Sequence, residues 1–476
     1  MNKVKIYLQQ NFFSIISLFL MVSFYLFFAI YDGAIIAVDS PSYIEMSFSR
    51  EPFYPLLLAV FRLLHPENYL LYIVIFQSLL MAVSGWYFAH YLIKKWKIHK
   101  LYGILLYFIP IAVSLLNRFL AKRSSMYTNN ILTEGICTSL YLLFIAFILG
   151  FCLDSCTKKM ILSWILMFFM FTSRKQMLMT LPIFLFALLY QAYEKKQLKK
   201  GILTAGISSL LLIFSFSLFD CTYNYFLRGT FEGHSSSNRF VSTIVFYHAD
   251  RTDADYIEDP HIKELFLEIY DVCDEKGALS YQANKGWMNR VAHFGDYYDI
   301  IQIDTMWPMI LQDARDHINK GYQSMDMSEE ELSLLYDMES DRINSIIIGA
   351  VLPHQLPEIA GLLIDNFLSG LVITLAQLRS IFIPYTVLMF LLYFAFTILI
   401  AGKNLRSKTI TEEFTTNKNS VLLSVITLIG IFSNTLVVSS VIFCQTRYMI
   451  YNMPLFYMTI CILFYQVCRN IKLKTK

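Results

Sequence analysis

Two acidic side chains stand at the ends of apolar segments, where their carboxylates could do acid–base chemistry. Asp39 follows the first long apolar run, and Glu134 directly precedes another one. A carboxylate held beside a substrate hydroxyl can accept its proton as a general base. Ionisable groups at a membrane boundary are functional by default. The alternative is that each acid is a solvated loop residue or a helix-terminal charge.

Cationic side chains are predicted at the same depth as the two acids. They come from three distant parts of the chain: Arg50, the hairpin of Arg174 and Lys175, and the hairpin of Arg447. Positive charge of this kind can stabilise the negative charge that develops on a departing phosphate. The alternative is that these arginines anchor the chain at the lipid headgroups or pair with nearby acids.

The segment that carries Asp39 has the pattern of a short helix. Ser40 followed by Pro41 predicts a helix start with Ser40 as the N-cap. A capping box from Ser42 to Glu45 is the alternative. In either case Asp39 lies just outside a helix N-terminus, where backbone dipoles favour an ionised carboxylate.

The rest of this first loop, residues 32–69, is expected to stay at the membrane surface. The prolines of residues 50–55 predict an extended turn, because a residue that precedes proline avoids the α region. The apolar run 56–64 is too short to cross a bilayer. It therefore predicts a helix that lies in the interface.

The composition requires a membrane. The chain has 476 residues, of which 56% are hydrophobic and 16% are aromatic, and a soluble domain could not bury that much apolar surface. We predict an all-α polytopic membrane protein with about ten transmembrane helices. The predicted spans are residues 12–31, 70–93, 101–117, 135–153, 160–173, 177–193, 201–219, 381–401, 420–442 and 449–468.

The charges of the loops predict the orientation. One alternating set of connections holds 20 Lys and Arg residues, whereas the short loops of the other set hold 8. The positive-inside rule makes the first set, with both termini, cytoplasmic. Loops 32–69 and 118–134, the segment 220–380 and the hairpin around Arg447 are then extracytoplasmic.

Residues 220–380 are predicted to form one large extracytoplasmic insert. It separates an N-terminal membrane module, residues 1–219, from a C-terminal membrane module, residues 381–476. The insert carries 26 acidic and 11 basic residues, whereas the rest of the chain carries 10 and 28. The protein is therefore expected to consist of a basic membrane part and an acidic soluble part.

Helices are expected within the insert. The amphipathic patterns of residues 261–277 and 329–352 predict two of them. The apolar segment 352–378 is interrupted by prolines and by Gly370. This pattern predicts helices lying at the membrane surface rather than a crossing.

The membrane part resembles the GT-C superfamily of integral membrane glycosyltransferases, which includes the bacterial aminoarabinose transferases and the protein O-mannosyltransferases. The resemblance covers residues 1–219 and 381–468 and does not cover the insert. It rests on the acidic first loop from Val38 to Tyr43, the Arg-x-Pro-x-Tyr-Pro turn from Arg50 to Pro55, Thr133-Glu134, the Thr-Ser-Arg hairpin at 172–174, and Gln445-Thr446-Arg447-Tyr448.

The resemblance implies sugar transfer from a polyprenyl-phosphate or polyprenyl-diphosphate donor on the extracytoplasmic face of a bacterial plasma (inner) membrane. Asp39 matches the acid taken as the general base. Glu134 matches a second acid that helps bind the acceptor or a divalent cation in some members. Many relatives carry an Asp-Glu pair where this chain has Asp39-Ser40, so the role of that second acid passes to Glu45 or is absent.

The resemblance also implies which residues contact the substrate. Arg174 and Arg447 match cations that neutralise the donor phosphate. The other residues expected to bind substrate are Arg50, Tyr54, Lys175, Tyr448, Glu45 and His234, although a surface histidine is the favoured interpretation of His234. The expected partners are the bilayer, the lipid-linked sugar and an extracytoplasmic glycan, lipid or protein acceptor, without nucleic acid.

Two other functions stay open. A transporter or flippase of a lipid-linked saccharide would place its polar groups near the bilayer midplane, often in interrupted helices. An O-antigen polymerase or ligase would rest on external arginines and a histidine rather than on a first-loop acid. Substitution of Asp39 compared with His234 would separate the polymerase or ligase from the transferase.

Overall fold

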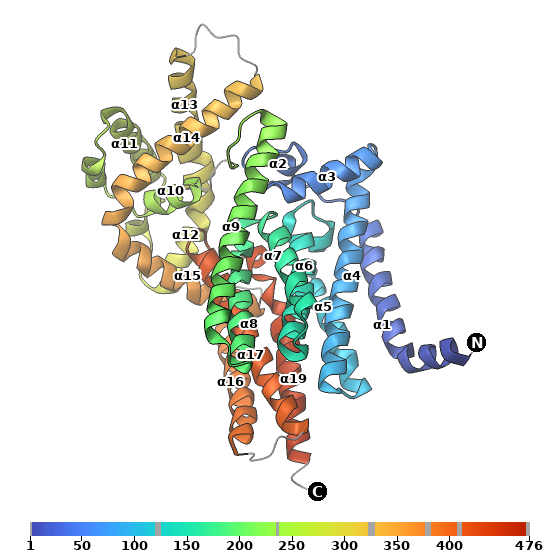
Figure 1. The fold of residues 1–476 in the computed structure, drawn as a ribbon. Coiled ribbons are helices and arrows are strands. Elements are labelled where there is room, and N and C mark those ends of the chain that lie inside the picture. The colour runs from blue at the N-terminus through green and yellow to red at the C-terminus, as the bar shows by residue number, and fades with distance from the viewer. Residues whose placement is uncertain are drawn as a thin grey trace.

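The computed structural model describes residues 2–119, 125–234, 238–321, 329–376, 382–406 and 412–472. The predicted loop 118–134 and insert 220–380 therefore each lie partly outside the described residues. Within them the fold is helical, apart from loops and an isolated bridge between Ile35 and Asn130. Figure 1 shows a bundle of long helices with a group of shorter helices at one end.

Nine helices of the described residues are long and apolar enough to cross a membrane, as expected of an all-α multi-pass membrane protein. They are α1 (Asn2–Asp32), α4 (Tyr69–Trp96), α5 (Lys100–Phe119), α6 (Thr133–Asp154), α8 (Thr180–Glu194) with the preceding turn η2 (Lys175–Met179), α9 (Leu198–Arg228), α15 (Leu356–Ala376), α16 (Ile383–Arg406) and α17 (Glu412–Ser439).

This set differs from the predicted spans at three places. Helix α7 (Thr157–Phe171) has only 15 residues, and α19 (Asn452–Lys472) is too polar over its described residues, so neither is a candidate span. Helix α15, in contrast, is one continuous helix of 21 residues. The predicted interruption of this segment is therefore wrong, since the chain continues as a helix through Gly370.

The physical reason for the continuity of α15 is the position of its prolines and the packing of its glycine. Pro353 precedes the helix, and Pro357 stands in its first turn, where the missing N–H would have no partner in any case. Gly370 lies where a side chain would not fit. A Cβ there would be 2.6 Å from Thr435 and 2.7 Å from Cys444, so glycine allows close packing rather than a break.

Helix α6 forms the centre of the bundle. In the most apolar stretch of α6, 83% of the residues are buried within the protein, compared with 11% in that of α9. Helix α9 thus presents apolar side chains outward, as a lipid-facing helix does. Helix α3 (Phe53–Leu64) is a shorter apolar helix, as predicted for the first loop, and lies across the end of α4 (Figure 1). The prediction of an extended turn over residues 50–55 is wrong from Phe53 on, because Pro55 stands in the first turn of the helix, where its missing N–H needs no partner.

The insert has a hydrophobic core of its own, which includes Phe246, Phe266 and Ile310. The predicted helices at 261–277 and 329–352 are found as α11 (Pro260–Glu275) and α14 (Glu329–Val351). The predicted boundary after residue 219 falls inside α9. The elements of the insert are α10 (Asn238–Tyr247), η3 (Arg251–Tyr256), α11 (Pro260–Glu275), η4 (Ser280–Gln282), α12 (Trp287–Ile301), η5 (Gln302–Met306), α13 (Trp307–Gly321), α14 (Glu329–Val351) and η6 (Leu352–His354).

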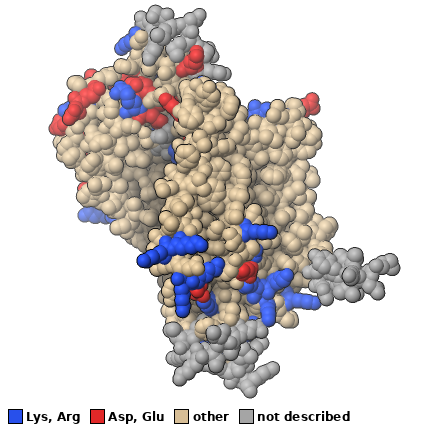
Figure 2. All heavy atoms as spheres, in the orientation of Figure 1, with Lys and Arg blue, Asp and Glu red and all other residues tan. Residues whose placement is uncertain are grey.

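The charges separate to the two ends of the molecule. Figure 2 shows acidic side chains over the insert, basic side chains towards the opposite end of the bundle, and a face with few charges between them. Ion pairs join neighbouring basic connections at that opposite end. Lys95 and Lys159 both pair with Asp154, and Lys418 pairs with Glu194.

Candidate functional site

Backbone hydrogen bonds hold the first loop against the second. The Ile35 amide donates to the Asn129 carbonyl at 2.9 Å, and the Ile131 amide donates to the Ile35 carbonyl at 3.0 Å. The Ser40 hydroxyl donates to the Ile131 carbonyl at 3.0 Å. Asp39 therefore lies close to the start of α6.

A buried glutamine forms hydrogen bonds with both loops. Gln77 of α4 is fully buried. Its Oε1 accepts a hydrogen bond from the Tyr54 hydroxyl at 3.0 Å, and its Nε2 donates to the Thr128 carbonyl at 2.9 Å. Sequence analysis missed Gln77, although a lone amide in an apolar span is a signal, because a buried polar group needs partners.

The local structure around Asp39 differs from the prediction. Asp39 itself is the N-cap of α2 (Ser40–Ile44) and makes no side-chain capping bond. The Ser40 hydroxyl is occupied by Ile131 and by the Ala37 amide, and the Ser42 hydroxyl donates to the Asp39 carbonyl. Neither the Ser40 cap nor the capping box forms. A capping hydroxyl accepts from the first turn of its helix, whereas the Ser40 hydroxyl accepts from the Ala37 amide and the Ser42 hydroxyl donates to the Asp39 carbonyl.

Asp39 lies between two arginines from opposite ends of the chain. Its Oδ1 accepts from Arg50 at 2.9 Å, and its Oδ2 accepts from Arg447 at 2.8 Å. Burial opposes the charge of Asp39, but the guanidiniums of Arg447 and Arg50 outweigh it and lower the pKa to about 2. Arg50 is held by a bond to Ser42 and by the ring of Tyr43, 4.5 Å away.

A second ion pair stands beside the first. The Arg174 guanidinium lies 2.7 Å from the Glu134 carboxylate, and Glu134 is almost fully buried. The Tyr448 ring connects the two pairs, because Arg174 and Arg447 each lie 4.7 Å from its centre. We call these residues the Asp39 cluster: Asp39, Arg50, Glu134, Arg174, Arg447 and Tyr448.

Neighbouring helices fix the hairpin that carries Arg447 and α18 (Thr446–Met449). The Gln176 amide donates to the Tyr448 carbonyl at 2.7 Å and to Asn434 of α17 at 2.8 Å. The Asn366 side chain of α15 accepts from the Cys444 amide at 3.0 Å. Helix α15 thus helps to place Arg447.

Three other residues that were predicted to bind substrate, Tyr54, Lys175 and Glu45, are not members of the Asp39 cluster. Tyr54 is fully buried and meets the Tyr43 ring edge-on at 5.3 Å, so it supports the loop from below. The Lys175 amide donates to the Glu51 carboxylate at 3.1 Å. Glu45 is exposed and is not part of the Asp39 cluster.

His234 is not brought into the Asp39 cluster either. Its Nδ1 lies 2.6 Å from a carboxylate oxygen of Asp220, and both side chains are buried. The ring also meets Phe216 edge-on. The pair therefore ties the start of the insert to α9.

Two charged residues of the insert interact electrostatically with members of the Asp39 cluster and were missed by sequence analysis. Asp299 of α12 lies in the electrostatic field of Arg447 and Asp39; burial is the main cause of its raised pKa. Burial lowers the pKa of Arg239 on α10, and the nearby guanidinium of Arg50 lowers it further. No motif in the insert distinguishes these two residues from its other charges.

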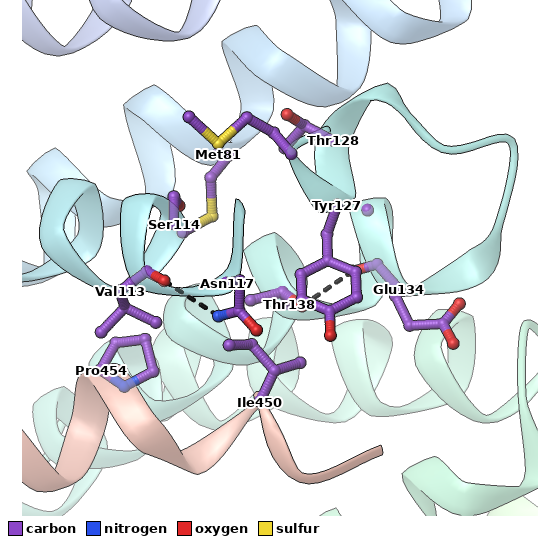
Figure 3. A pocket seen from close by; sticks show the side chains of 12 residues that line it. Met81, Val113, Ser114, Asn117, Tyr127, Thr128, Glu134, Thr138, Ile450 and Pro454 are labelled. Atoms are coloured by element: carbon purple, nitrogen blue, oxygen red, sulfur yellow. Dashed lines mark hydrogen bonds between the residues drawn. The ribbon is translucent and has the colours of Figure 1, made fainter. Parts of the chain in front are cut away.

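A small pocket lies on another side of Glu134, among α4, α5, α6 and α19 (Figure 3). In this view the Glu134 carboxylate points away from Asn117 and Pro454. Most of the wall is apolar, with Met81, Val113, Ile450 and Pro454 among its residues. Ser114, Asn117, Thr128 and Thr138 add polar groups to the same wall.

The acids of the site do not have the arrangement of a metal centre. Within the described ranges, no three side chains of His, Cys, Asp or Glu gather closely enough to hold a metal ion. Asp39 and Glu134 are each paired with arginine instead.

Comparisons of the chain with protein-family models, with curated proteins and with solved structures find no match.

Proposed function

We propose that the chain is a glycosyltransferase of a bacterial plasma (inner) membrane, which moves a sugar from a polyprenyl-phosphate or polyprenyl-diphosphate donor to an extracytoplasmic acceptor. The observation that carries the proposal is the placement of Asp39 between Arg50 and Arg447, beside the Glu134–Arg174 pair. A carboxylate and several guanidiniums at the end of a bundle of membrane helices suit a substrate that carries both a phosphate and a lipid chain.

In the proposed reaction the carboxylate accepts a proton and the guanidiniums stabilise negative charge. The acceptor oxygen forms a bond to the anomeric carbon of the sugar, and its proton passes to the Asp39 carboxylate. The bond between that carbon and the phosphate oxygen breaks, and its electron pair stays on the phosphate. Arg447 and Arg174 stabilise the negative charge that the phosphate gains.

The low pKa of Asp39 gives the donor a further role. A carboxylate with a pKa of about 2 is a weak base. A bound phosphate would compete with Asp39 for Arg447, and loss of this guanidinium makes a carboxylate more basic. The donor thus prepares Asp39 to accept the proton.

The test is transfer of radiolabelled sugar from a panel of polyprenyl-phosphate and polyprenyl-diphosphate sugars. Membranes would contain the wild type, Asp39→Asn or His234→Ala at equal amounts. Asp154→Asn is the matched control, since Asp154 also pairs with two cations but lies at the opposite end of the bundle. We expect Asp39→Asn to lose about 100-fold or more of the transfer rate, and the control to keep it.

Three results would count against the proposal. Wild-type transfer rates in Asp39→Asn would exclude Asp39 as the general base. Loss of transfer in His234→Ala with an active Asp39→Asn would favour a polymerase or ligase that uses the His234–Asp220 pair. Translocation of the lipid-linked sugar without transfer would identify a flippase.

A further inference from the structure

The first loop reverses its direction at Met46, just after α2. Helix α2 ends at Ile44, and the Ser47 amide donates to the Ser42 carbonyl at 2.9 Å. Between them Met46 has a φ of 56°, in the left-handed region that glycine usually supplies at such a helix end. Side chains other than glycine rarely adopt this conformation, and they keep it only where the surrounding structure holds them.

The turn at Met46 brings the chain back to Asp39. The Arg50 guanidinium donates to the Ser42 hydroxyl at 2.7 Å and to the Asp39 carboxylate at 2.9 Å. The Ser42 hydroxyl in turn donates to the Asp39 carbonyl at 2.7 Å. The ion pair of Arg50 and Asp39 therefore closes this segment on itself, and the closure depends on the conformation of Met46.

Arg228 of α9 holds this turn from outside the loop. It lies in the last turn of α9. Its guanidinium donates to the Met46 carbonyl, and it also donates to the side-chain oxygen of Asn224 at 2.7 Å. The same guanidinium lies 5.5 Å from the centre of the ring of Phe48, which is buried. Arg228 thus contacts both the residue in the left-handed conformation and the loop just after it.

Asn224 connects this contact to the start of the insert. Asn224 is fully buried, and its side-chain amide donates to the Glu232 carbonyl at 2.9 Å. Glu232 belongs to the segment that follows α9 and leads to α10. The first loop and the entry to the insert are therefore joined through Asn224 and Arg228.

A second arginine holds the same end of α2 in a different way. Arg62 of α3 donates to the carbonyl of Ile44, the last residue of α2. The last carbonyls of a helix have no partner within the helix, so Arg62 satisfies an ordinary helix end. Arg228, in contrast, bonds to the residue with the left-handed backbone. Substitution of Met46 can therefore tell the two arginines apart.

We propose that Arg228 is a positioning residue, which holds Met46 in its left-handed conformation and thereby keeps Arg50 paired with Asp39. The inference rests on the proposed function for its effect on sugar transfer, because it is there that Asp39 acts on a substrate. The conformation of the first loop itself can be measured without transfer.

The experiment uses Met46→Gly as a rescue. Glycine adopts the left-handed conformation without strain, so Met46→Gly should make Arg228 dispensable if Arg228 acts through Met46. The full chain in neutral phosphatidylcholine nanodiscs is compared as the wild type, Arg228→Gln, Met46→Gly and the double variant. Arg62→Gln, alone and combined with Met46→Gly, is the matched control. Hydrogen exchange of the amides of residues 42–50 is read by mass spectrometry.

We expect Arg228→Gln to raise the exchange rate of the Ser47 amide at least about tenfold, since its bond to Ser42 depends on the turn. The double variant should exchange within about threefold of the wild type. Arg62→Gln should also raise the exchange rate, and Met46→Gly should not restore it. The kcat/KM of sugar transfer should fall about tenfold in Arg228→Gln, because Arg50 and Asp39 are misplaced, and should recover in the double variant.

Three results would overturn the inference: wild-type exchange in Arg228→Gln, no recovery in the double variant, or an equal recovery of Arg62→Gln. Recovery in the double variant separates the proposal from a folding defect, because Met46→Gly changes only the turn. The two proposals fail separately, since exchange is read without transfer. A chain in which exchange is rescued but no sugar is transferred would reject the glycosyltransferase and keep Arg228 as the residue that holds Met46.

Discussion

The charge of Asp39 is decided by its tertiary neighbours. Burial alone would raise the pKa of this carboxylate, but Arg447 and Arg50 lower it to about 2. A folded-state pKa below the ordinary value of 3.8 means that ionised Asp39 stabilises the folded chain above about pH 4. That contribution is lost as the pH falls towards 2.

Asp337 of α14 has the opposite behaviour. Burial, followed by the carboxylate of Asp341, raises its pKa from 3.8 to about 6 against the opposing charge of Arg239. The folded chain therefore holds this proton more tightly than the unfolded chain does, and its stability falls as the pH rises from about 4 to about 6. We expect Asp337→Asn to stabilise the chain by roughly 1–3 kcal/mol near neutral pH, and by less near pH 4.

Thermal unfolding in detergent at the two pH values measures this effect. Asp255→Asn is the control, because Asp255 is 75% exposed and pairs with Lys263 on the surface. Its substitution should change the stability by less than about 0.5 kcal/mol. An equal effect of Asp337→Asn at both pH values would show that the carboxylate is not held protonated.

At the scale of elements, α15 shows how packing overrides a local signal. Its prolines and glycine predicted interruption, yet the helix is continuous and anchors the Arg447 hairpin through Asn366. Asp365 of the same helix pairs with Arg290 of α12. Helix α15 thus joins the insert to the membrane helices.

Substitution of two glycines in α15 tests its packing. In Gly370→Ala the new Cβ would lie 2.6 Å from Thr435 and 2.7 Å from Cys444, so we expect a loss of roughly 1–3 kcal/mol. Gly361→Ala is the matched control, since its Cβ would meet nothing within 4 Å. It should be neutral or stabilising by up to about 1 kcal/mol, because alanine favours a helix. Thermal unfolding should therefore show a loss of stability in Gly370→Ala and no loss in Gly361→Ala. Equal losses of stability in the two variants would contradict the packing of α15.

At the scale of the whole molecule, the two ends carry opposite charge. The insert is acidic, and the basic connections gather at the other end of the bundle (Figure 2). The positive-inside rule then predicts that the insert and the Asp39 cluster are extracytoplasmic.

Cysteine labelling in cells tests this orientation. Glu264 of the insert and Lys199 near the start of α9 are both exposed, and each would be replaced by cysteine in a background without the native cysteines. A membrane-impermeant maleimide should label Glu264→Cys in intact cells, and should label Lys199→Cys only after permeabilisation. The reverse pattern would show that the insert faces the cytoplasm.

The sequence by itself determined the membrane class, most long helices, the short helix after the first proline turn and the separation of charge. These features depend on the composition and length of single segments, and no distant contact is needed to produce them. The acids and arginines at segment ends could be named for the same reason, because each ends an apolar run.

Only the tertiary structure decided which of these charges meet. Asp39 and Arg447 are 408 positions apart, and no local pattern relates them. The Ser40 hydroxyl does not cap α2, because it accepts from the Ala37 amide and donates to the Ile131 carbonyl of the second loop. Helix α12 of the insert packs against the hairpin of Arg447 through the rings of Phe294 and Tyr298. Each of these outcomes depends on packing between distant segments, which hydrophobic period and turn signals do not specify.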